Sequence, residues 1–223
     1  MAFNTNPINF PNLTSKATPI GGDIILIADS AANNTLKQAL VSSLPAGAGS
    51  GSFIKIASAT AANVATLDFA ADLSATYDSY LFIWEDFQPV SNATTLGGRV
   101  GTGGGPTYSS TTYFGTTANI KNNGITSAAS ATSQADFANT TTPMSNSATA
   151  TSGGWAYILN TQNASDNKVI QGMNTHIETA SSNGSVTIAT VFWQTATALT
   201  SFRWIQSSGN LNKGTWKLYG VTN

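Results

Sequence analysis

The sequence predicts an all-β protein in which a jelly-roll-like β-sandwich follows a small N-terminal module of one strand and one helix. Two observations carry this prediction. Short apolar segments rich in β-branched and aromatic residues recur between Phe53 and Val221, and turn residues separate them. No apolar run with helical spacing follows Leu44. With 223 residues, the chain is long enough for one large β domain and a small appendage.

The densest apolar run, Tyr77–Val90, is the centre of the predicted domain. In an extended chain, one face of this run carries Tyr80, Phe82 and Trp84, and the other carries mainly Leu81, Ile83 and Phe87. Apolar side chains on both faces predict a central strand that is buried on both sides. A buried helix is the alternative. The run is short and is bounded by Asp78-Ser79 and Pro89, which favours the strand.

The N-terminal module, residues 1–45, is predicted to anchor the protein. Asp23–Asp29 forms a short apolar strand, and Asn34 caps a helix that Pro45 stops. These two elements are too small to bury their own apolar face. We therefore expect the module to dock on the main domain, on another copy of itself or on a host structure. The apolar side chains expected to make that contact are Ile24, Ile25, Leu26, Ile27, Leu36 and Leu40.

A glycine- and serine-rich segment, residues 46–52, is a flexible linker by composition and marks the predicted domain boundary. The β-sandwich is predicted over residues 53–223. Its expected strands are Phe53–Ala57, Leu67–Phe69, Tyr80–Phe87, Thr94–Val100, Thr107–Phe114, Trp155–Leu159, Val169–Ile177, Val186–Trp193, Phe202–Ile205 and Thr215–Val221. Large apolar residues are rare between Thr116 and Ser152, where we expect long loops or a weak edge strand anchored by Ile120, Ile125 and Phe137.

The composition excludes several kinds of partner. Charged residues make up 9% of the chain, against roughly 25% in ordinary soluble proteins. The nine Lys and Arg residues are scattered singly, so there is no basic footprint for nucleic acid and none for an anionic membrane surface. No segment approaches the ~20 apolar residues of a membrane span, and the N-terminus has no signal-peptide pattern. The absence of cysteine excludes disulfides and leaves the redox compartment open.

No catalytic motif is present in the sequence, and we expect no enzymatic activity. His176 is the only histidine, and no partner motif accompanies it, so we interpret it as a surface or half-buried strand residue. Candidate carboxylate pairs for a glycosidase are Glu85 with Asp86, Asp68 with Asp72, and Asp166 with Glu178. Neighbours in a strand point to opposite faces, which excludes the first pair, and turn aspartates cap local backbone amides. We favour a structural role for all of them.

The sequence also predicts no cofactor and no metal ion. Gly101–Gly105 is similar to a phosphate-binding loop only in its glycines, since Pro106 and a strand follow in place of a helix. A mobile loop explains this segment better. One histidine, no cysteine and scattered acids are too few ligands for a transition-metal site. Calcium held by turn aspartates and backbone carbonyls stays open but without support.

Two tyrosines beside the glycine loop, Tyr108 and Tyr113, are the candidate binding residues. Little apolar sequence surrounds them, and Asn, Thr and Ser side chains lie close by in the chain. Aromatic faces next to hydroxyl and amide groups suit sugar rings, which indicates a surface glycan as the ligand. The alternative is that both tyrosines are strand residues that pack into the sandwich.

Three stretches resemble virion proteins of tailed bacteriophages. Gly209–Val221 resembles their closing strand, which ends in the pattern G-x-x-x-L-Y-G and here contains G-T-W-K-L-Y-G. Tyr77–Phe82, followed by Gln88-Pro89-Val90, is similar to their central strand, and Thr18–Leu44 to small linking modules in phage fibres. The middle of the chain, from Thr102 to Asn183, carries no such resemblance, and a recognition surface is expected to diverge there.

This resemblance implies a structural protein of the virion, with a jelly-roll-like domain, a homotrimeric state and an N-terminal region fixed to other proteins of the tail or capsid. The leading expectation is a tail fibre or receptor-binding protein whose exposed loops, chiefly 101–117 and 127–153, contact a host surface glycan. A capsid decoration or cement protein, with residues 1–44 across the capsomer joints, is the rival. A carbohydrate-active enzyme on the same sandwich is the third interpretation.

Overall fold

The computed structural model describes residues 24–29, 35–40, 53–122, 124–129, 132–179 and 183–221. The chain divides into two compact units, Met1–Gly49 and Ser50–Asn223. All regular structure in these ranges is β-strand, and no helix occurs in them. The protein is therefore all-β, as the sequence predicts. The predicted linker, residues 46–52, lies outside the described residues.

In the first unit, β1 (Ile24–Asp29) and β2 (Thr35–Leu40) form an antiparallel hairpin in which Ile24 pairs with Leu40 and Asp29 with Thr35. The strand predicted over Asp23–Asp29 is β1. The helix predicted after Asn34 is wrong over 35–40, and its last residues lie outside the described part. Apolar residues four apart fit a helix, but a helix of about two turns is marginal in water. Pairing with β1 provides partners for the backbone groups that face between the two strands.

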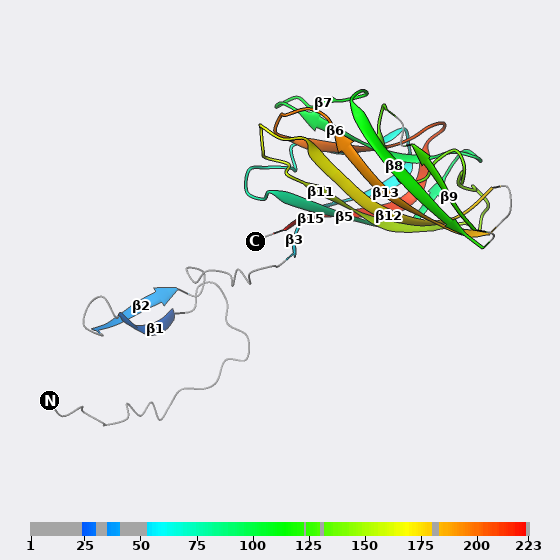
Figure 1. Cartoon of the computed structure of the whole chain (residues 1–223). Coiled ribbons are helices and arrows are strands. Elements are labelled where there is room, and N and C mark those ends of the chain that lie inside the picture. The colour runs from blue at the N-terminus through cyan, green and yellow to red at the C-terminus, as the bar shows by residue number, and fades with distance from the viewer. Residues whose placement is uncertain are drawn as a thin grey trace. The chain divides into compact units, whose positions relative to one another are not determined.

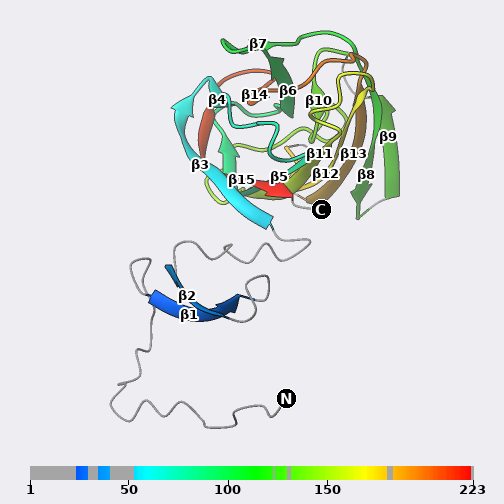
Figure 2. The same cartoon turned by 90° about the vertical axis from the view of Figure 1, so that its left-hand side faces the viewer.

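The second unit contains an eight-stranded antiparallel sheet that curves strongly. Figure 2 shows it as a concave layer running from β3 at one edge to β9 at the other. In spatial order its strands are β3 (Phe53–Val64), β15 (Leu211–Val221), β5 (Ser79–Pro89), β11 (Ser152–Leu159), β12 (Lys168–Ile177), β13 (Gly184–Trp193), β8 (Tyr113–Lys121) and β9 (Gly124–Ala129).

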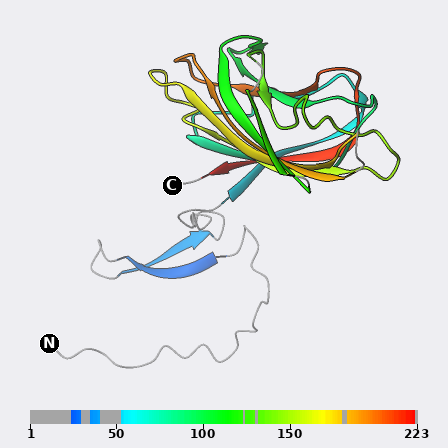
Figure 3. The same ribbon diagram turned by 45° about the vertical axis from the view of Figure 1, so that its right-hand side comes forward.

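A smaller, five-stranded sheet covers the concave side of the larger one, which gives a β-sandwich-like arrangement of two layers (Figures 1 and 3). Its strands are β10 (Ala135–Asp136), β6 (Leu96–Thr102), β14 (Ser201–Gln206) and β4 (Thr66–Phe69), with β7 (Thr107–Tyr108) paired to β6. Both sheets therefore take strands from the beginning, the middle and the end of the unit.

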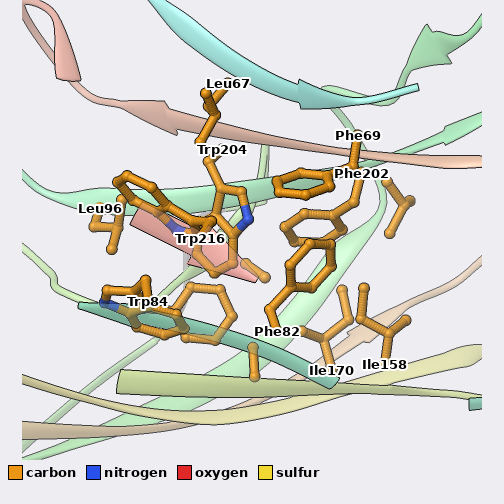
Figure 4. Packing of buried hydrophobic residues seen from close by; sticks show 14 of the residues in the cluster. Leu67, Phe69, Phe82, Trp84, Leu96, Ile158, Ile170, Phe202, Trp204 and Trp216 are labelled. Carbon is orange, nitrogen blue, oxygen red and sulfur yellow. The ribbon is translucent and has the colours of Figure 1, made fainter. Parts of the chain in front are cut away.

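Aromatic rings from both sheets fill the space between the layers. Figure 4 shows Phe202 and Trp204 of β14 against Phe82 and Trp84 of β5, with Trp216 of β15 beside them. The ring centroids of Trp84 and Trp204 are 4.8 Å apart, and those of Phe82 and Phe202 are 5.0 Å apart. All five side chains are almost fully buried. This aromatic cluster is the centre of the hydrophobic core.

The prediction that β5 is buried on both faces is wrong in part. Tyr80, Phe82 and Trp84 do face the core together, whereas Ile83 on the other face is 37% exposed. Phe87 also lies in the core, because Asp86 forms a bulge with a φ of 53° and the register with β11 and β15 shifts there. One extra residue returns Phe87 to the inner face.

Residues 116–152 were expected to form long loops or a weak edge strand, and β9 is an edge strand of the larger sheet. Of the expected anchors Phe137 is buried, whereas Ile120 and Ile125 are exposed. The expectation of loops is wrong for the strands in this range. Most of β8 and all of β9 and β10 fall there, and β8 is paired along its length with β13. The segment predicted as one strand over Thr107–Phe114 is two, β7 and the start of β8, separated by a turn at Ser109–Thr112. After Tyr113, the buried inward residues of β8 are the polar Thr117 and Asn119, so no apolar alternation marked the rest of this strand.

Candidate functional site

A polar pocket of about 450 Å³ lies beside β6, β10 and β14 in the second unit. Its walls include Arg99, Gln134, Asp136, Asn139 and Gln206, and Ile205 is one of its few apolar residues. Small-molecule sites in proteins typically have volumes of about 300–1,000 Å³ and a few convergent polar groups. The pocket has that size and is more polar than most such sites.

The strands hold the polar groups of this pocket in place. Asp136 of β10 pairs with Gly97 of β6, and a side chain at Gly97 would come within 2.3 Å of Gln134 Nε2. Glycine therefore lets the Gln134 side chain lie on the strand, from where its Nε2 donates to Asp136 Oδ1 at 2.7 Å. On β6, Arg99 Nε donates to the carbonyl of Ser133 at 3.1 Å. One positive and one negative side chain are thus fixed at the same site.

Tyr108 lies next to this region, and one face of its ring is covered by Arg203. The guanidinium carbon of Arg203 lies 4.0 Å from the centroid of the Tyr108 ring. Arg203 in turn donates to both carboxylate oxygens of Asp68, at 2.7 and 2.6 Å. Burial, followed by the negative charge of Asp68, raises the pKa of Tyr108. Its role in glycan binding stays a prediction, with Arg203 already on one face of the ring.

Tyr113, the second predicted binding residue, is part of the core, so the alternative interpretation holds for it. Its side chain is only 2% exposed, and its hydroxyl accepts a hydrogen bond from Val100 N–H at 2.8 Å. Burial raises the pKa of this hydroxyl. An aromatic face that is enclosed in this way cannot stack on a sugar. Tyr108 and Tyr113 therefore do not form one binding surface.

The predicted anchoring residues all lie on the hairpin of the first unit. Ile24, Ile25, Leu26 and Ile27 are in β1, and Leu36 and Leu40 are in β2. In the register, Ile25 lies opposite Ala39 and Ile27 opposite Lys37. Their expected role in anchoring remains a prediction for a strand hairpin, since the strand–helix module on which it was based does not form.

A buried polar network occupies the inner face of β12, β13 and β8. Asn174 is its centre: Trp84 Nε1 and Ser152 Oγ donate to Asn174 Oδ1 at 3.1 and 2.6 Å. The amide nitrogen of Asn174 lies 3.2 Å from His176 Nδ1, and His176 Nε2 lies 2.8 Å from the carbonyl of Thr142. That carbonyl can only accept, so Nε2 carries a proton, and Nδ1 accepts from the Asn174 amide, so the histidine is neutral. The expectation of a surface or half-buried His176 is wrong, as the residue is 2% exposed.

A second branch of the network is built around Asn119 of β8. Its Oδ1 accepts from Thr187 Oγ1 at 2.8 Å and from Thr142 Oγ1 at 3.0 Å, and its Nδ2 donates to Thr141 Oγ1 at 3.1 Å. These bonds tie the segment after β10 to the concave sheet. The recognition loop expected over 127–153 is therefore partly interior: Phe137, Asn139, Thr142 and Met144 are all buried.

The buried histidine makes the stability of the protein depend on pH. Burial lowers the pKa of His176 below its ordinary 6.5, the bond to the Thr142 carbonyl and the charge of Glu178 act in the opposite direction, and Lys121 lowers it further. Below pH 6.5 the unfolded chain binds a proton that the folded chain does not, so stability falls as the pH falls from 6.5 towards the folded pKa.

We expect the free energy of unfolding to drop by up to about 1.4 kcal/mol between about pH 7.5 and about pH 5.5 from this group. Urea unfolding at the two pH values measures the drop. His176→Gln keeps a donor for the Thr142 carbonyl and removes the titration, so it is the control. An equal drop in the variant would assign the effect to other groups.

Six carboxylates of this unit, among them Glu85, Asp86, Asp166 and Glu178, are paired with cations or amides. Lys217 binds Glu85, Lys213 Nζ lies 2.9 Å from Asp86, and both acids are exposed. Asp166 Oδ2 accepts from Asn163 Nδ2 at 2.6 Å. Lys121 Nζ lies 3.7 Å from the buried Glu178. Among the described residues no group of three or more His, Asp and Glu side chains could hold a metal ion.

The outer face of the eight-stranded sheet carries a row of apolar side chains. Ile83 lies opposite Trp155, Trp155 opposite Met173, and Met173 opposite Ile188. We call these four residues the outer row. Ile83, Trp155 and Ile188 are 37%, 38% and 44% exposed. Farther along the same face, Phe192 lies opposite Phe114, which is 65% exposed.

Neither the polar pocket nor the outer row was predicted from the sequence. The pocket joins residues near 97, 135 and 206, which only the strand pairing of β6, β10 and β14 brings together. The outer row did leave a signal, since the Val186–Trp193 segment is apolar at both odd and even positions. This segment was predicted from the sequence only as one of the strands of the sandwich.

The chain matches no protein-family model, no curated protein and no solved structure. No helix long and apolar enough to cross a membrane occurs among the described residues. The arrangement of side chains is thus the basis for a functional assignment, together with the resemblance noted in the sequence.

Proposed function

We propose that this chain is a structural protein of a tailed-bacteriophage virion, of the tail-fibre or receptor-binding type, and that it assembles as a homotrimer. The observation that carries the proposal is the outer row, Ile83, Trp155, Met173 and Ile188, which crosses four neighbouring strands of one sheet. The resemblance of Gly209–Val221 to the closing strand of such proteins supports the virion setting.

An exposed apolar row of this kind suits an interface between subunits. Single exposed apolar side chains are common, whereas contiguous apolar patches mark surfaces that other molecules cover. Lys217, opposite Ile83, is the charged neighbour at one end of the row. Interface centres are poor in charge and rich in aromatic residues and Met. A second copy of the same sheet would meet all of these conditions.

The two-layer arrangement supports a jelly-roll-like interpretation of the fold. The last strand, β15, lies between β3 and β5, so the end of the chain closes the sheet beside the first strand of the unit. Neighbouring strands that are distant in sequence are typical of jelly rolls. In this proposal the sandwich is the exposed part of the protein, and the N-terminal hairpin is its attachment to other virion proteins.

The position of the protein in virions tests the leading role against its rival. A tail fibre is expected in isolated tails at a few copies per particle. A capsid decoration protein would instead be found in tailless heads, at a copy number that matches capsid symmetry. Quantitative mass spectrometry of separated heads and tails distinguishes these outcomes. Absence from both fractions would contradict the virion assignment.

A carbohydrate-active enzyme is the remaining candidate. Glu85 is paired with Lys217, and Glu178 lies near Lys121. The nearest charged partner of each glutamate is therefore a lysine and not a second carboxylate. Retaining glycosidases hold two carboxyl groups about 5–5.5 Å apart. Cleavage of a glycan that disappears in Glu85→Gln or Glu178→Gln would support this candidate against the structural role.

Trp155→Glu is expected to dissociate the trimer without unfolding the subunit. The Trp155 side chain is 38% exposed at the centre of the outer row, so a carboxylate is tolerated in the free subunit. In the assembly it would be buried without a partner, which costs several kcal/mol per interface. Sedimentation velocity at micromolar concentration measures the change in mass.

Thr107→Asp, on an exposed strand of the other sheet, is the matched control and should remain trimeric. A trimer of unchanged stability in Trp155→Glu would move the interface away from the outer row. A monomeric wild type at the same concentration would contradict the proposed assembly itself.

A further inference from the structure

We propose that the polar pocket beside β6, β10 and β14 binds an acidic sugar, a hydroxylated ring with one carboxylate, and that Arg99 binds the carboxylate. The inference goes beyond the virion assignment and does not depend on it, because the pocket belongs to a single subunit and lies beside the smaller sheet, whereas the outer row lies on the larger one. The pairing, the exposure and the fixed orientation of Arg99 support this class of ligand.

The two arginines of the chain, Arg99 and Arg203, lie directly opposite each other on β6 and β14. Like charges in directly opposite positions of an antiparallel pair destabilise it. Arg203 is compensated on its other side, since it donates to both carboxylate oxygens of Asp68. Among the described residues, no carboxylate lies within ion-pair distance of the Arg99 guanidinium. A bound carboxylate would compensate Arg99 as Asp68 compensates Arg203.

Arg99 also carries the charge that a ligand in the pocket would meet. Its side chain lines the pocket and is half-buried. Asp136, the other charged residue of the wall, is only 6% exposed, and its Oδ1 accepts from Gln134 Nε2 at 2.7 Å. The formal charges of the two residues cancel, but the accessible one is positive. This difference in exposure favours an anionic ligand over a neutral one.

The guanidinium of Arg99 is held in place with its terminal nitrogens left over. Its Nε donates to the carbonyl of Ser133 at 3.1 Å, so little side-chain ordering would be lost on binding. A planar guanidinium binds a carboxylate through two parallel hydrogen bonds. Phosphate fits the same fork but carries close to two negative charges at neutral pH, and it would also be repelled by Asp136. A singly charged carboxylate balances Arg99 better.

The rest of the wall suits the hydroxyl groups of a sugar ring. Hydroxyl and amide side chains make up most of it, among them Ser133, Thr140 and Asn139. A hydroxyl group both donates and accepts hydrogen bonds, so it can pair with either kind of side chain. The volume of about 450 Å³ admits one sugar ring. Ile205 and Ala129 supply the little apolar wall that there is, which disfavours a flat hydrophobic acid.

Saturation-transfer NMR on the full chain tests the inference with a matched pair of probes, methyl glucuronide and methyl glucoside, which differ only at the carbon that bears the carboxylate. The glucuronide should bind the wild type about tenfold more tightly or better, since it alone can form the charge-assisted pair. Acetate and inorganic phosphate, the latter followed by its ³¹P line width, should each bind more weakly than the glucuronide. Arg99→Gln should abolish the preference for the glucuronide. Lys213→Gln, which removes one positive charge from the larger sheet, is the control and should bind as the wild type does.

Arg99→Lys separates the charge from the planar fork. Lysine keeps the positive charge and a donor for the Ser133 carbonyl, so its Kd for the glucuronide should lie between those of the wild type and Arg99→Gln. If the melting curve shows that Arg99→Gln does not fold, the Arg99→Lys protein must still bind the glucuronide more weakly than the wild type. Equal affinities of the wild type for the two glycosides, or no saturation transfer to the glucuronide, would overturn the proposal. So would tighter binding of acetate or phosphate, or a glucuronide Kd that the folded Arg99 variants leave unchanged.

Discussion

Replacing Trp204 by alanine is expected to lower the free energy of unfolding by about 3–5 kcal/mol, the range for truncation of a large buried side chain. Trp204 is fully buried, and its ring centroid lies 4.8 Å from that of Trp84, 5.1 Å from Phe202 and 5.2 Å from Phe137. It thus connects the smaller sheet, the larger sheet and the segment after β10. Removing the indole would leave a cavity where the two sheets and the segment after β10 meet.

Two further variants make the measurement specific. Trp204→Phe keeps a ring and is expected to cost clearly less than Trp204→Ala, because the indole nitrogen has no hydrogen-bond partner among the described residues. Trp155→Ala truncates a tryptophan that is 38% exposed in the outer row, so it should cost clearly less than Trp204→Ala. Urea unfolding followed by circular dichroism gives the three values. Equal losses for Trp204 and Trp155 would contradict the assignment of the core.

Asn174→Leu is expected to destabilise the protein by about 3 kcal/mol, because leucine keeps the branched shape of asparagine but cannot form its hydrogen bonds. The change leaves Trp84 Nε1 and Ser152 Oγ without their acceptor and His176 Nδ1 without its donor. Each buried polar group that loses its partner costs about 1–3 kcal/mol, and the hydroxyl can recover part of its share by rotation. The loss would be large for a substitution that adds apolar surface to a buried position.

Thr175→Leu is the matched control, because the neighbouring residue on β12 is exposed and faces away from the network. It should change stability by no more than about 0.5 kcal/mol. Where Asn174→Leu does not fold, Trp84→Phe removes only one donor and should cost about 1 kcal/mol. An Asn174→Leu protein as stable as the wild type would show that the network contributes nothing to the fold.

Strands with large apolar side chains at alternate positions, on either face, were predicted from the sequence. β5, β11 and β15 each carry large apolar side chains at alternate positions, and each forms where the alternation indicated. β8 was only partly found because its inward residues include Thr117 and Asn119, which bond to other polar groups inside the sandwich. Alternation detects burial against hydrocarbon, and it does not detect burial within a polar network.

Other errors came from features that depend on the pairing with neighbouring strands. Leu36 and Leu40 fit one face of a helix and one face of a strand equally, and the pairing with β1 selected the strand. Phe87 was assigned to the wrong face because the bulge at Asp86 adds one residue to the count. His176 lies among polar neighbours in sequence, and one of them, Asn174, is its hydrogen-bond partner inside the sandwich, together with the distant Thr142.

The candidate sites were less predictable than the fold. Tyr108 and Tyr113 are five positions apart in sequence, but one ring lies on the outside of the smaller sheet and the other in the core. The pocket depends on Gly97, whose missing side chain makes room for Gln134. Neither relation leaves a pattern in the sequence. The first follows from the pairing of β7 with β6 and of β8 with β13, and the second from the pairing of β6 with β10.

Hydroxyl-radical footprinting of the wild-type chain over a range of concentrations tests the proposed assembly most directly. Trp155 is 38% exposed in the isolated subunit and Trp204 is fully buried, so the two tryptophans serve as reporter and reference. If copies of the chain pack through the outer row, oxidation of Trp155 should fall as the concentration rises, while Trp204 stays unreactive throughout. Oxidation of Trp155 at the same rate from the most dilute to the most concentrated sample would contradict the account.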